Sequence, residues 1–364
     1  MGIAVLPRRP LNNLYQQVRS ICHHCSRAHS KTSQLVTTRR DFGPLLSRNP
    51  SIPKPALRST NCFPARHFST TSILCKSSKV MTDADIESAK RAAAAKAVSD
   101  WFDPEATHVG IGSGSTIKYV VEAIQKQSNN PRIRFVPTGW QSRQVIIQAG
   151  LTPIAFDSLP ESVMLDIAFD GADEVDEELN CIKGGGACLF QEKLVAERAR
   201  KFICVADYRK NQSRLLTNWP TIPIEVAPIA VPTVLRSLRT LGSTNPQLRT
   251  TTLEKSGPLK TDQDFFIIDA PFKPLLTARD LVEGKGKGDG SDGTWEVDRL
   301  CQAIKRLTGV LEVGIFSGLN GIDAEGLREK AAGKSVPVIT GGQKPVAVYF
   351  GMQDGSVQQR QAGE

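Results

Sequence analysis

The chain has 364 residues, enough for about two domains, and a formal net charge of +9. Residues 1–80 hold 13 Lys and Arg against one acid, whereas the remainder holds 33 Lys and Arg against 36 Asp and Glu, a net charge of −3. Because the excess basic charge lies at the N-terminus, it predicts no nucleic-acid partner for the rest of the chain. No apolar run approaches the length of a membrane span, so no membrane partner is predicted either.

The segment 1–80 is rich in Arg, Ser and Thr, poor in acids and interrupted by Pro, which is typical of a mitochondrial transit peptide. ARHFSTTS at 65–72 is similar to the cleavage region of such peptides. Met81 opens MTDADIESAK, a sensible start for a cytosolic protein, so translation from Met81 is a second interpretation that stays open. We therefore treat 1–80 as a transit-peptide-like or disordered extension and leave it out of the fold prediction.

Cysteine and histidine exclude several kinds of site. CHHC at 22–25, with His29 nearby, has zinc-ligand chemistry, but no second ligand pair follows at finger spacing, so chance composition is favoured. Beyond residue 80 the cysteines follow no pattern, which favours a reducing compartment without a disulfide framework. That part has one histidine, His108, which excludes a His-rich metal site and any mechanism that needs two histidines.

From residue 83 to 207, predicted helices and strands alternate with short connections. In chain order they are a helix at 83–99, a strand entering a glycine turn at 107–116, a helix at 118–127, a strand at 132–138, a helix at 140–150, strands at 151–157 and 163–170, a helix at 187–200 and a strand at 201–207. This alternation predicts an α/β fold, with an open, mostly parallel, Rossmann-like sheet and helices on both faces.

The pattern changes near 224–230. The elements predicted after it are a helix at 231–242, a strand pair near 248–254 and 264–270, a flexible loop at 284–293, a helix at 297–307 and a strand at 310–316. They predict a smaller α+β domain over 227–337. The apolar strand 344–351 is expected to return to the first sheet, so the main domain is predicted to comprise 81–226 and 338–357. No function is assigned to the longer segments 241–262 and 284–293.

GIGSGST at 110–116 is the first candidate for a ligand site, because ligands of open parallel sheets bind at the carboxyl ends of the strands. Its glycines allow close backbone approach to an anion, and its hydroxyl groups add donors. A phosphate cradle and a ligand-free tight turn both remain open. It is no Walker loop, and Thr138 stands where a dinucleotide-binding acid would be expected, which argues against a nicotinamide dehydrogenase.

DGADEVDEELNCIKGGGACLFQEK at 170–193 is the second candidate. Asp170 and Asp173 follow a buried strand, Lys183 precedes three glycines, and Glu192 lies early on the next helix. Crowded acids raise one another's pKa while a lysine lowers it, so such a site can supply both an acid and a base near neutrality. The alternative is a surface salt-bridge network.

The remaining acids and aromatic residues of these segments are expected to be structural. A solvated turn and helix cap is favoured for the four other acids, Glu174, Asp176, Glu177 and Glu178. His108 is expected to be structural or solvent-facing, and the phenylalanines of the strands are expected in the core. Trp140 is a weak candidate for the mouth of the cleft.

With these motifs in this order, the sequence resembles ribose-5-phosphate isomerase of type A, in a eukaryotic or fungal-like form. The resemblance covers nearly all of 82–357 and rests on five stretches, GIGSGST, FDGADEVD, IKGGGACLFQEKLVA, KFICVAD and PIEVAP. It implies a metal-free, cofactor-free aldose–ketose isomerase that interconverts D-ribose 5-phosphate and D-ribulose 5-phosphate in the non-oxidative pentose phosphate pathway. It also implies a cytoplasmic homodimer or higher homo-oligomer; a mitochondrial address applies if 1–80 is translated and acts as a transit peptide.

Site residues follow from the resemblance by position. Glu192 corresponds to the general base that moves the proton between C1 and C2. Asp170 and Asp173 correspond to carboxylates that handle hydroxyl protons and assist ring opening, and Lys183 to the cation beside the enediolate oxygen. The implied substrate-binding residues are Lys90 near the phosphate, Ser113, Gly114, Ser115 and Thr116 in the first turn, Gly171 and Ala172, and Gly184, Gly185 and Gly186.

The sequence departs from the family at one point. A lysine that usually stands shortly before the PIEV-like segment and reaches the phosphate is missing, and Arg209, Lys210 or Arg214 could replace it. The alternative function is a non-catalytic sugar-phosphate sensor on a related fold. Such sensors usually carry a DNA-binding domain, and 1–80 has no helix-turn-helix pattern.

Overall fold

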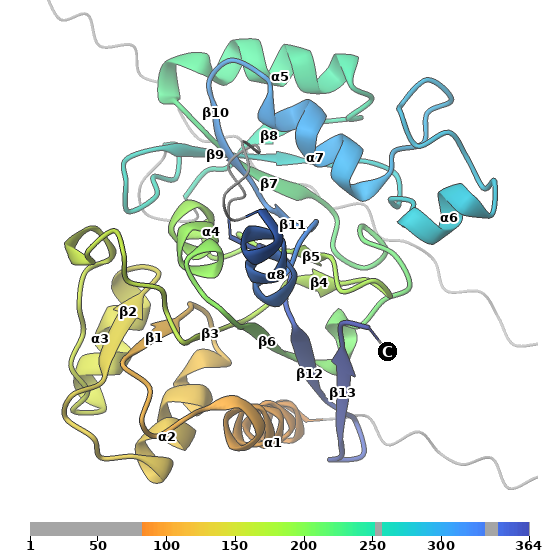
Figure 1. Ribbon diagram of the computed structural model, residues 1–364. Coiled ribbons are helices and arrows are strands. Elements are labelled where there is room, and N and C mark those ends of the chain that lie inside the picture. The colour runs from red at the N-terminus through yellow and green to blue at the C-terminus, as the bar shows by residue number, and fades with distance from the viewer. Residues whose placement is uncertain (1–81, 252–256, 332–340, 364) are drawn as a thin grey trace, which may run out of the picture. The chain divides into compact units, whose positions relative to one another are not determined.

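The structure is a computed structural model that describes residues 82–251, 257–331 and 341–363 (Figure 1). All of these residues fall in one compact unit. CHHC at 22–25 and the transit-peptide-like extension lie outside the described residues. Among the helices that the structure describes, none is long and apolar enough to span a bilayer.

Six strands form the central sheet, in the order β13–β12–β6–β3–β1–β2. Their bounds are β1 His108–Ile111, β2 Arg134–Pro137, β3 Ile167–Asp170, β6 Phe202–Asp207, β12 Ala347–Gly351 and β13 Val357–Gln361. Neighbours run parallel except β13, which pairs antiparallel with β12. β3 and β6 are buried over their whole length, as expected for parallel strands covered on both faces.

Helices cover both faces of this sheet. They are α1 (Asp83–Trp101), α2 (Ile117–Gln127), α3 (Trp140–Gln148) and α4 (Leu189–Glu197). The apolar residues of α1 and α2 pack with one set of alternating strand residues, and those of α4 pack with the other set. The predicted α/β class and the return of 344–351 to the first sheet are therefore confirmed. The carboxyl ends of β1, β3 and β6 meet at one edge, where the site is expected.

A second layer is built on an antiparallel sheet in the order β10–β7–β9–β8. Its strands are β7 Ile222–Val226, β8 Gln247–Leu248, β9 Phe266–Ala270 and β10 Val310–Val313. Helices α5 (Val231–Thr240) and α7 (Val297–Lys305) bury their apolar stripes against it, which agrees with the predicted α+β part. The predicted boundary after residue 226 assigns β7 to the first domain, whereas β7 pairs with β9 and β10. The division into two domains stays a prediction.

A small third sheet, in the order β11–β5–β4, was not predicted. It consists of β4 Glu174–Val175, β5 Cys181–Ile182 and β11 Ile315–Phe316. Two more helices were also missed, α6 Ala278–Val282 and α8 Gly321–Ala331. The predicted strand 310–316 is two strands of different sheets, β10 and β11, and Gly314 between them lies so close to its neighbours that a Cβ there would be 2.4 Å from the carbonyl of Lys183.

The predicted strand 151–157 is wrong. Its backbone makes only an isolated bridge between Pro153 and Phe135, and residues 156–158 form a 3₁₀ turn. Pro153 has no N–H to donate to a ladder, which explains why the apolar residues here do not extend the sheet. Near the strand predicted at 248–254, the structure has only the two-residue strand β8. Residues 252–256 lie outside the described part.

Candidate active site

The turn after β1 supports the carboxylate that ends β3. The backbone N–H of Ser113 donates to Oδ1 of Asp170 over 3.1 Å, and the N–H of Gly171 donates to the same oxygen over 2.7 Å. Gly112 lies directly against this carboxylate, since a Cβ at Gly112 would be 1.9 Å from Oδ1. Only glycine allows the two strand ends to approach so closely, and the turn therefore fixes Asp170 in one orientation.

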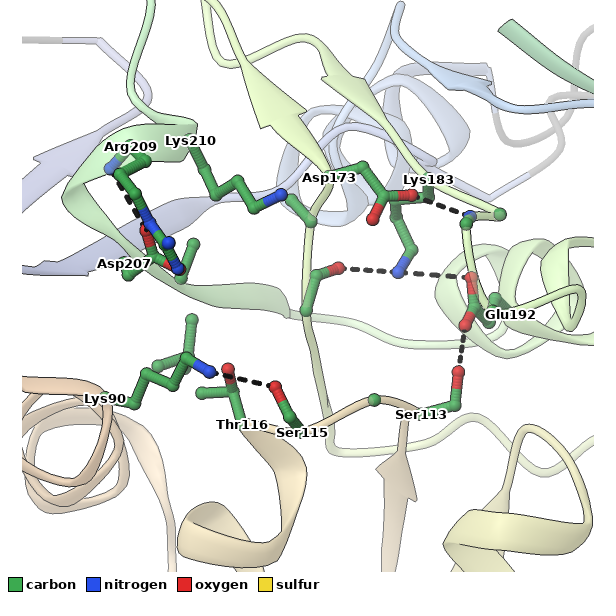
Figure 2. A pocket seen from close by; sticks show the side chains of 18 residues that line it. Lys90, Ser113, Ser115, Thr116, Asp173, Lys183, Glu192, Asp207, Arg209 and Lys210 are labelled. Atoms are coloured by element: carbon green, nitrogen blue, oxygen red, sulfur yellow. Dashed lines mark hydrogen bonds and ion pairs between the residues drawn. The ribbon is translucent and has the colours of Figure 1, made fainter. Parts of the chain in front are cut away.

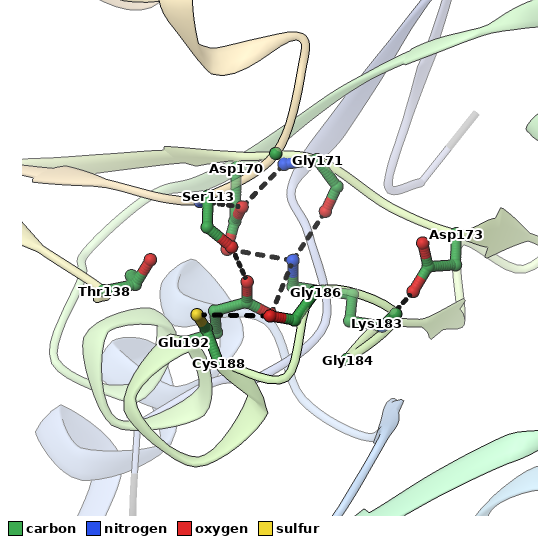
Figure 3. A network of polar contacts seen from close by, with 12 residues as sticks. Ser113, Thr138, Asp170, Gly171, Asp173, Lys183, Gly184, Gly186, Cys188 and Glu192 are labelled. Atoms are coloured by element: carbon green, nitrogen blue, oxygen red, sulfur yellow. Dashed lines mark hydrogen bonds and ion pairs between the residues drawn. The ribbon is translucent and has the colours of Figure 1, made fainter. Parts of the chain in front are cut away.

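Lys183 joins two carboxylates that come from different elements (Figure 3). Its Nζ lies 2.9 Å from Oδ2 of Asp170 and 3.2 Å from Oε2 of Glu192, and it donates to the carbonyl of Gly171 over 2.6 Å. These three charged side chains are at most 4% exposed. Ser113 donates its hydroxyl hydrogen to Oε1 of Glu192. The surface salt-bridge alternative is excluded, because the cluster is buried.

Burial and mutual charge set the protonation of this cluster. Burial raises the pKa of Asp170 to about 7, and the carboxylate of Glu192 adds to the rise, while Lys183 opposes it. Burial alone would lower the pKa of Lys183, but Asp170 and Glu192 outweigh it and raise that pKa, so Lys183 stays charged. Oδ2 of Asp170 and Oε2 of Glu192 are buried, and within the described residues they face only the Lys183 ammonium, so each still has a lone pair for a ligand hydroxyl. The cluster can thus hold a stable cation, a base and a group that titrates near neutrality.

Asp173 and the three glycines line the same pocket. Oδ2 of Asp173 accepts a hydrogen bond from the N–H of Gly185 over 2.7 Å, and burial raises the pKa of this carboxyl. Gly184 has φ +102°, a conformation that favours glycine, and a Cβ at Gly185 would be 2.8 Å from Asp173. The glycines therefore let the chain fold around the carboxylate and bring backbone groups to the pocket.

The opposite wall carries separate cations and hydroxyl groups (Figure 2). Lys90 of α1 donates to the hydroxyl of Ser115 over 3.0 Å and pairs with Glu87. Thr116 lies at the N-terminus of α2, whose backbone N–H groups favour an anion. Together with the acid–lysine wall these groups enclose a pocket of about 250 Å³, a size that suits a small polar ligand rather than a dinucleotide.

Of the three candidate replacements for the missing lysine, two line this pocket. Arg209 is engaged by Asp207 through Nε and Nη2, at 2.7 and 3.0 Å. Lys210 lies with Nζ 4.6 Å from the centre of the Trp219 ring and has no carboxylate partner within the described residues. Arg214 instead pairs with Asp280 of α6 and does not line the pocket. Of the three, Lys210 is therefore the one that lines the pocket without a salt bridge in the described part of the chain, a distinction that the sequence could not make.

All fourteen residues singled out from the sequence meet at this site: thirteen line the pocket, and Asp170 contacts it through Lys183. Trp140, the weak candidate, is 68% exposed and lines a neighbouring pocket instead. Three residues of β6, Val205, Ala206 and Asp207, also line the pocket and were not predicted. Within the described residues, no cluster of three or more His, Cys, Asp or Glu could hold a metal ion.

The prediction that the remaining acids are solvated is wrong for Glu174 and Asp176, which are fully buried. Glu174 accepts hydrogen bonds from three backbone N–H groups, those of Leu216, Asn218 and Trp219. Asp176 closes its own turn by accepting from the backbone and amide of Asn180, and burial raises its pKa to about 6. Protein N–H groups replace water at both carboxylates, so these acids are structural.

Comparisons with known proteins agree with the geometry. The family described as ribose 5-phosphate isomerase A (phosphoriboisomerase A) matches residues 134–322. Among curated relatives, ribose-5-phosphate isomerase of Mycosarcoma maydis is 48% identical over 67% of this chain and 79% of its own length, and that of Candida albicans is 40% identical over 75% and 95%.

Solved structures give the same result. A D-ribose-5-phosphate isomerase in complex with phospho-erythronic acid matches with TM-score 0.59 and 27% identity, over 76% of this chain and 99% of that one. Ribose 5-phosphate isomerase A of Methanocaldococcus jannaschii matches with TM-score 0.56 and 26% identity, over the same shares. The alternative of a non-catalytic sensor gains no support from these matches.

Proposed function

Because the chain belongs to the ribose 5-phosphate isomerase A family and interconverts D-ribose 5-phosphate and D-ribulose 5-phosphate, we propose that Glu192 is the general base of this reaction. The observation that supports this role is the position of its carboxylate, in the lining of the pocket and beside the Lys183 ammonium. Oε2 of Glu192 is buried and lies 3.2 Å from the Lys183 ammonium, with no donor beyond this ion pair in the described part of the chain. A base that abstracts a proton from carbon needs an unoccupied oxygen beside a group that stabilises the resulting anion.

The proton movements follow from the arrangement. Glu192 removes the proton on C2 of the open-chain aldose, and the electron pair of that bond forms the C1–C2 double bond of an enediolate. Negative charge then develops on O1, where the Lys183 ammonium stabilises it. Asp170, whose pKa is about 7, relays the hydroxyl proton from O2 to O1, and protonated Glu192 returns its proton to C1 to give the ketose.

Asp173 has a separate role in the proposal, at the step before isomerisation. Ring opening needs a proton removed from the C1 hydroxyl and one delivered to the ring oxygen. The raised pKa of Asp173 allows it to exchange protons with the sugar, and the N–H of Gly185 holds its other oxygen in place. The backbone groups of Gly184–Gly186 line the same part of the pocket and provide contacts to the sugar hydroxyls.

The phosphate lies at the other wall in this proposal. Lys90, the hydroxyl groups of Ser115 and Thr116, and the N-terminus of α2 provide donors for its oxygens. Lys210 supplies the additional positive charge, because Arg209 is already engaged by Asp207 and Arg214 lies elsewhere. This assigns the function of the missing lysine to a residue that precedes it in the chain.

Exchange with solvent tests the role of Glu192. Protein that starts at Met81 and has been treated with EDTA should convert ribose 5-phosphate and incorporate deuterium from D₂O at the transferred position. The Glu192→Gln variant should lose about 10²–10⁴-fold in kcat, the usual contribution of a general base, with KM nearly unchanged. Wild-type rates of turnover and exchange in the variant would remove Glu192 as the base.

We also propose where the protein works and how it assembles. The sequence from Met81 supports a cytoplasmic protein, and residues 1–80 support a mitochondrial address if they are translated. A fusion of residues 1–80 to a fluorescent reporter should enter mitochondria, and a diffuse cytosolic signal would contradict that address. The family supports a homodimer or higher homo-oligomer, and a monomeric mass in light scattering would contradict it.

A further inference from the structure

Lys193 follows the proposed base on α4 and is 2% exposed, yet the proposed reaction gives it no role. Its Nζ donates to the carbonyls of Val313 and Ile315 over 2.6 and 2.8 Å, and lies 3.1 Å from Oε1 of Glu312. An ammonium has three hydrogens to donate, and these three acceptors use all of them. Lys193 is therefore a fully satisfied buried anchor between α4 and the segment 312–316.

The same segment holds Lys183 from the other side. The backbone N–H of Lys183 donates to the carbonyl of Gly314 over 2.9 Å, and Ile315 pairs with Ile182 in the small sheet. The ring of Phe316 lies 5.4 Å from Nζ of Lys183 and 4.8 Å from Nζ of Lys193. Both members of the Lys183–Glu192 pair are thus attached to one short stretch of chain.

Helix α4 needs such an external anchor. It has only nine residues, and its N-cap, Cys188, makes no side-chain hydrogen bond to the first turn. Isolated helices of this length are not stable by themselves, so tertiary contacts determine where Glu192 lies. Gly314 allows the close approach, since a Cβ there would be 2.4 Å from the carbonyl of Lys183.

We propose that Lys193 is a positioning residue, which fixes α4 to the segment 312–316 and thereby sets the 3.2 Å separation of Lys183 and Glu192. This inference rests on the proposed role of Glu192. Lys193 does not itself line the pocket and acts only through its neighbour Glu192. The reacting groups must be held within a few tenths of an ångström, so the anchor affects the rate of the chemical step more than binding.

The test compares Lys193→Met with a matched control, Lys305→Met. Lys305 of α7 contacts the same Glu312 and the adjacent carbonyl of Leu311, each at 2.5 Å, but does not touch α4. In Lys193→Met, kcat should fall about 10- to 100-fold, the effect of a displacement near 1 Å, while KM changes less than about threefold. Lys305→Met should keep both constants near those of the wild type.

Two further measurements separate positioning from damage to the fold. Glu312→Gln weakens one acceptor of three and should lower kcat by less than about 10-fold. If Lys193→Met does not fold, a Glu312→Gln protein with wild-type kcat overturns the inference instead. In the Glu192→Gln background, Lys193→Met should lower the residual rate no further, because the group it positions is gone.

The inference is overturned by any of three results. The first is a folded Lys193→Met protein with wild-type kcat, the second an equal loss in Lys305→Met, and the third a full multiplicative loss in the Glu192→Gln background. Failure of the base assignment looks different, because Glu192→Gln alone would then remain active.

Discussion

The two walls of the pocket hold their charges in different ways. On the acid–lysine wall, Asp170, Lys183 and Glu192 are nearly fully buried, and each charge has a partner within 3.2 Å. On the phosphate wall, Lys90 is also buried and paired, but Arg209 is exposed, and Lys210 forms no salt bridge in the described part of the chain. A buried paired network gives one fixed geometry, whereas a partly hydrated cation can adapt to a mobile anion. In the proposed mechanism the first wall carries out the chemistry and the second captures the phosphate.

Lys183→Met should produce the largest effect, because it damages the acid–lysine wall in two ways. Removing the donor beside the enediolate oxygen should lower kcat by about 10²–10³-fold. Leaving two buried carboxylates without their cation should also lower the free energy of unfolding by about 3–5 kcal/mol. Steady-state kinetics and urea unfolding measure the two losses.

The control for this variant is Lys118→Met. Lys118 lies on α2, is half-exposed and pairs with Glu87 of α1. It does not line the pocket. It should leave kcat and stability close to the wild type, since exposed ion pairs contribute at most about 1 kcal/mol. A Lys183→Met protein with unchanged kcat would show that the acid–lysine wall is structural rather than catalytic.

The acid–lysine wall is also the part of the site that the sequence predicts best. Its members lie in one stretch of 24 residues, so a strand end, a glycine turn and the first turns of a helix bring them together by local structure alone. The stretch does not reveal which of its acids are buried. Glu174 is structural because N–H groups of residues 216–219, some forty positions later, come to it in the fold.

The phosphate wall was harder to predict, because the fold brings its residues together from distant parts of the sequence. Its residues come from α1, the turn after β1 and the turn after β6, and only the fold separates Lys210 from Arg214. Longer-range errors have local causes: Pro153 prevents a predicted strand, and Gly314 divides one strand between two sheets. Sequence patterns report periodicity and local spacing, but they do not report which distant backbone groups satisfy a side chain.

Lys210→Met tests the phosphate wall and should have an intermediate effect, mainly on KM. Loss of one charge-assisted contact to the phosphate, worth about 1.5–3 kcal/mol, should raise KM by roughly 10- to 100-fold and change kcat less. Because the wild-type contact is partly hydrated, added salt should raise the KM of the wild type more than that of the variant.

Arg214→Met is the matched control, since Arg214 pairs with Asp280 and does not line the pocket. Its KM and salt dependence should stay close to those of the wild type. If Lys210→Met kept the wild-type KM while Arg214→Met raised it, the phosphate would have to be assigned to a different part of the surface.

The last effect concerns stability, and it distinguishes the walls by pH. Burial and the neighbouring Glu192 raise the pKa of Asp170 from 3.8 to about 7, so the folded protein keeps a proton that the unfolded chain releases. The contribution of this group to the unfolding free energy is full below pH 4 and is lost as pH rises through about 7. Asp176, with a pKa raised to about 6, acts in the same direction and is present in both proteins of the comparison.

The stability advantage of the wild type over Asp170→Asn should therefore shrink between pH 4 and 7 in urea titrations. Substitutions of Lys210 should leave this pH dependence in place, because Asp170 and Asp176 are both present in those variants. Parallel curves for the wild type and Asp170→Asn would mean that the folded protein ionises Asp170 as easily as the unfolded chain, and the carboxyl would then be unable to relay a proton near neutrality.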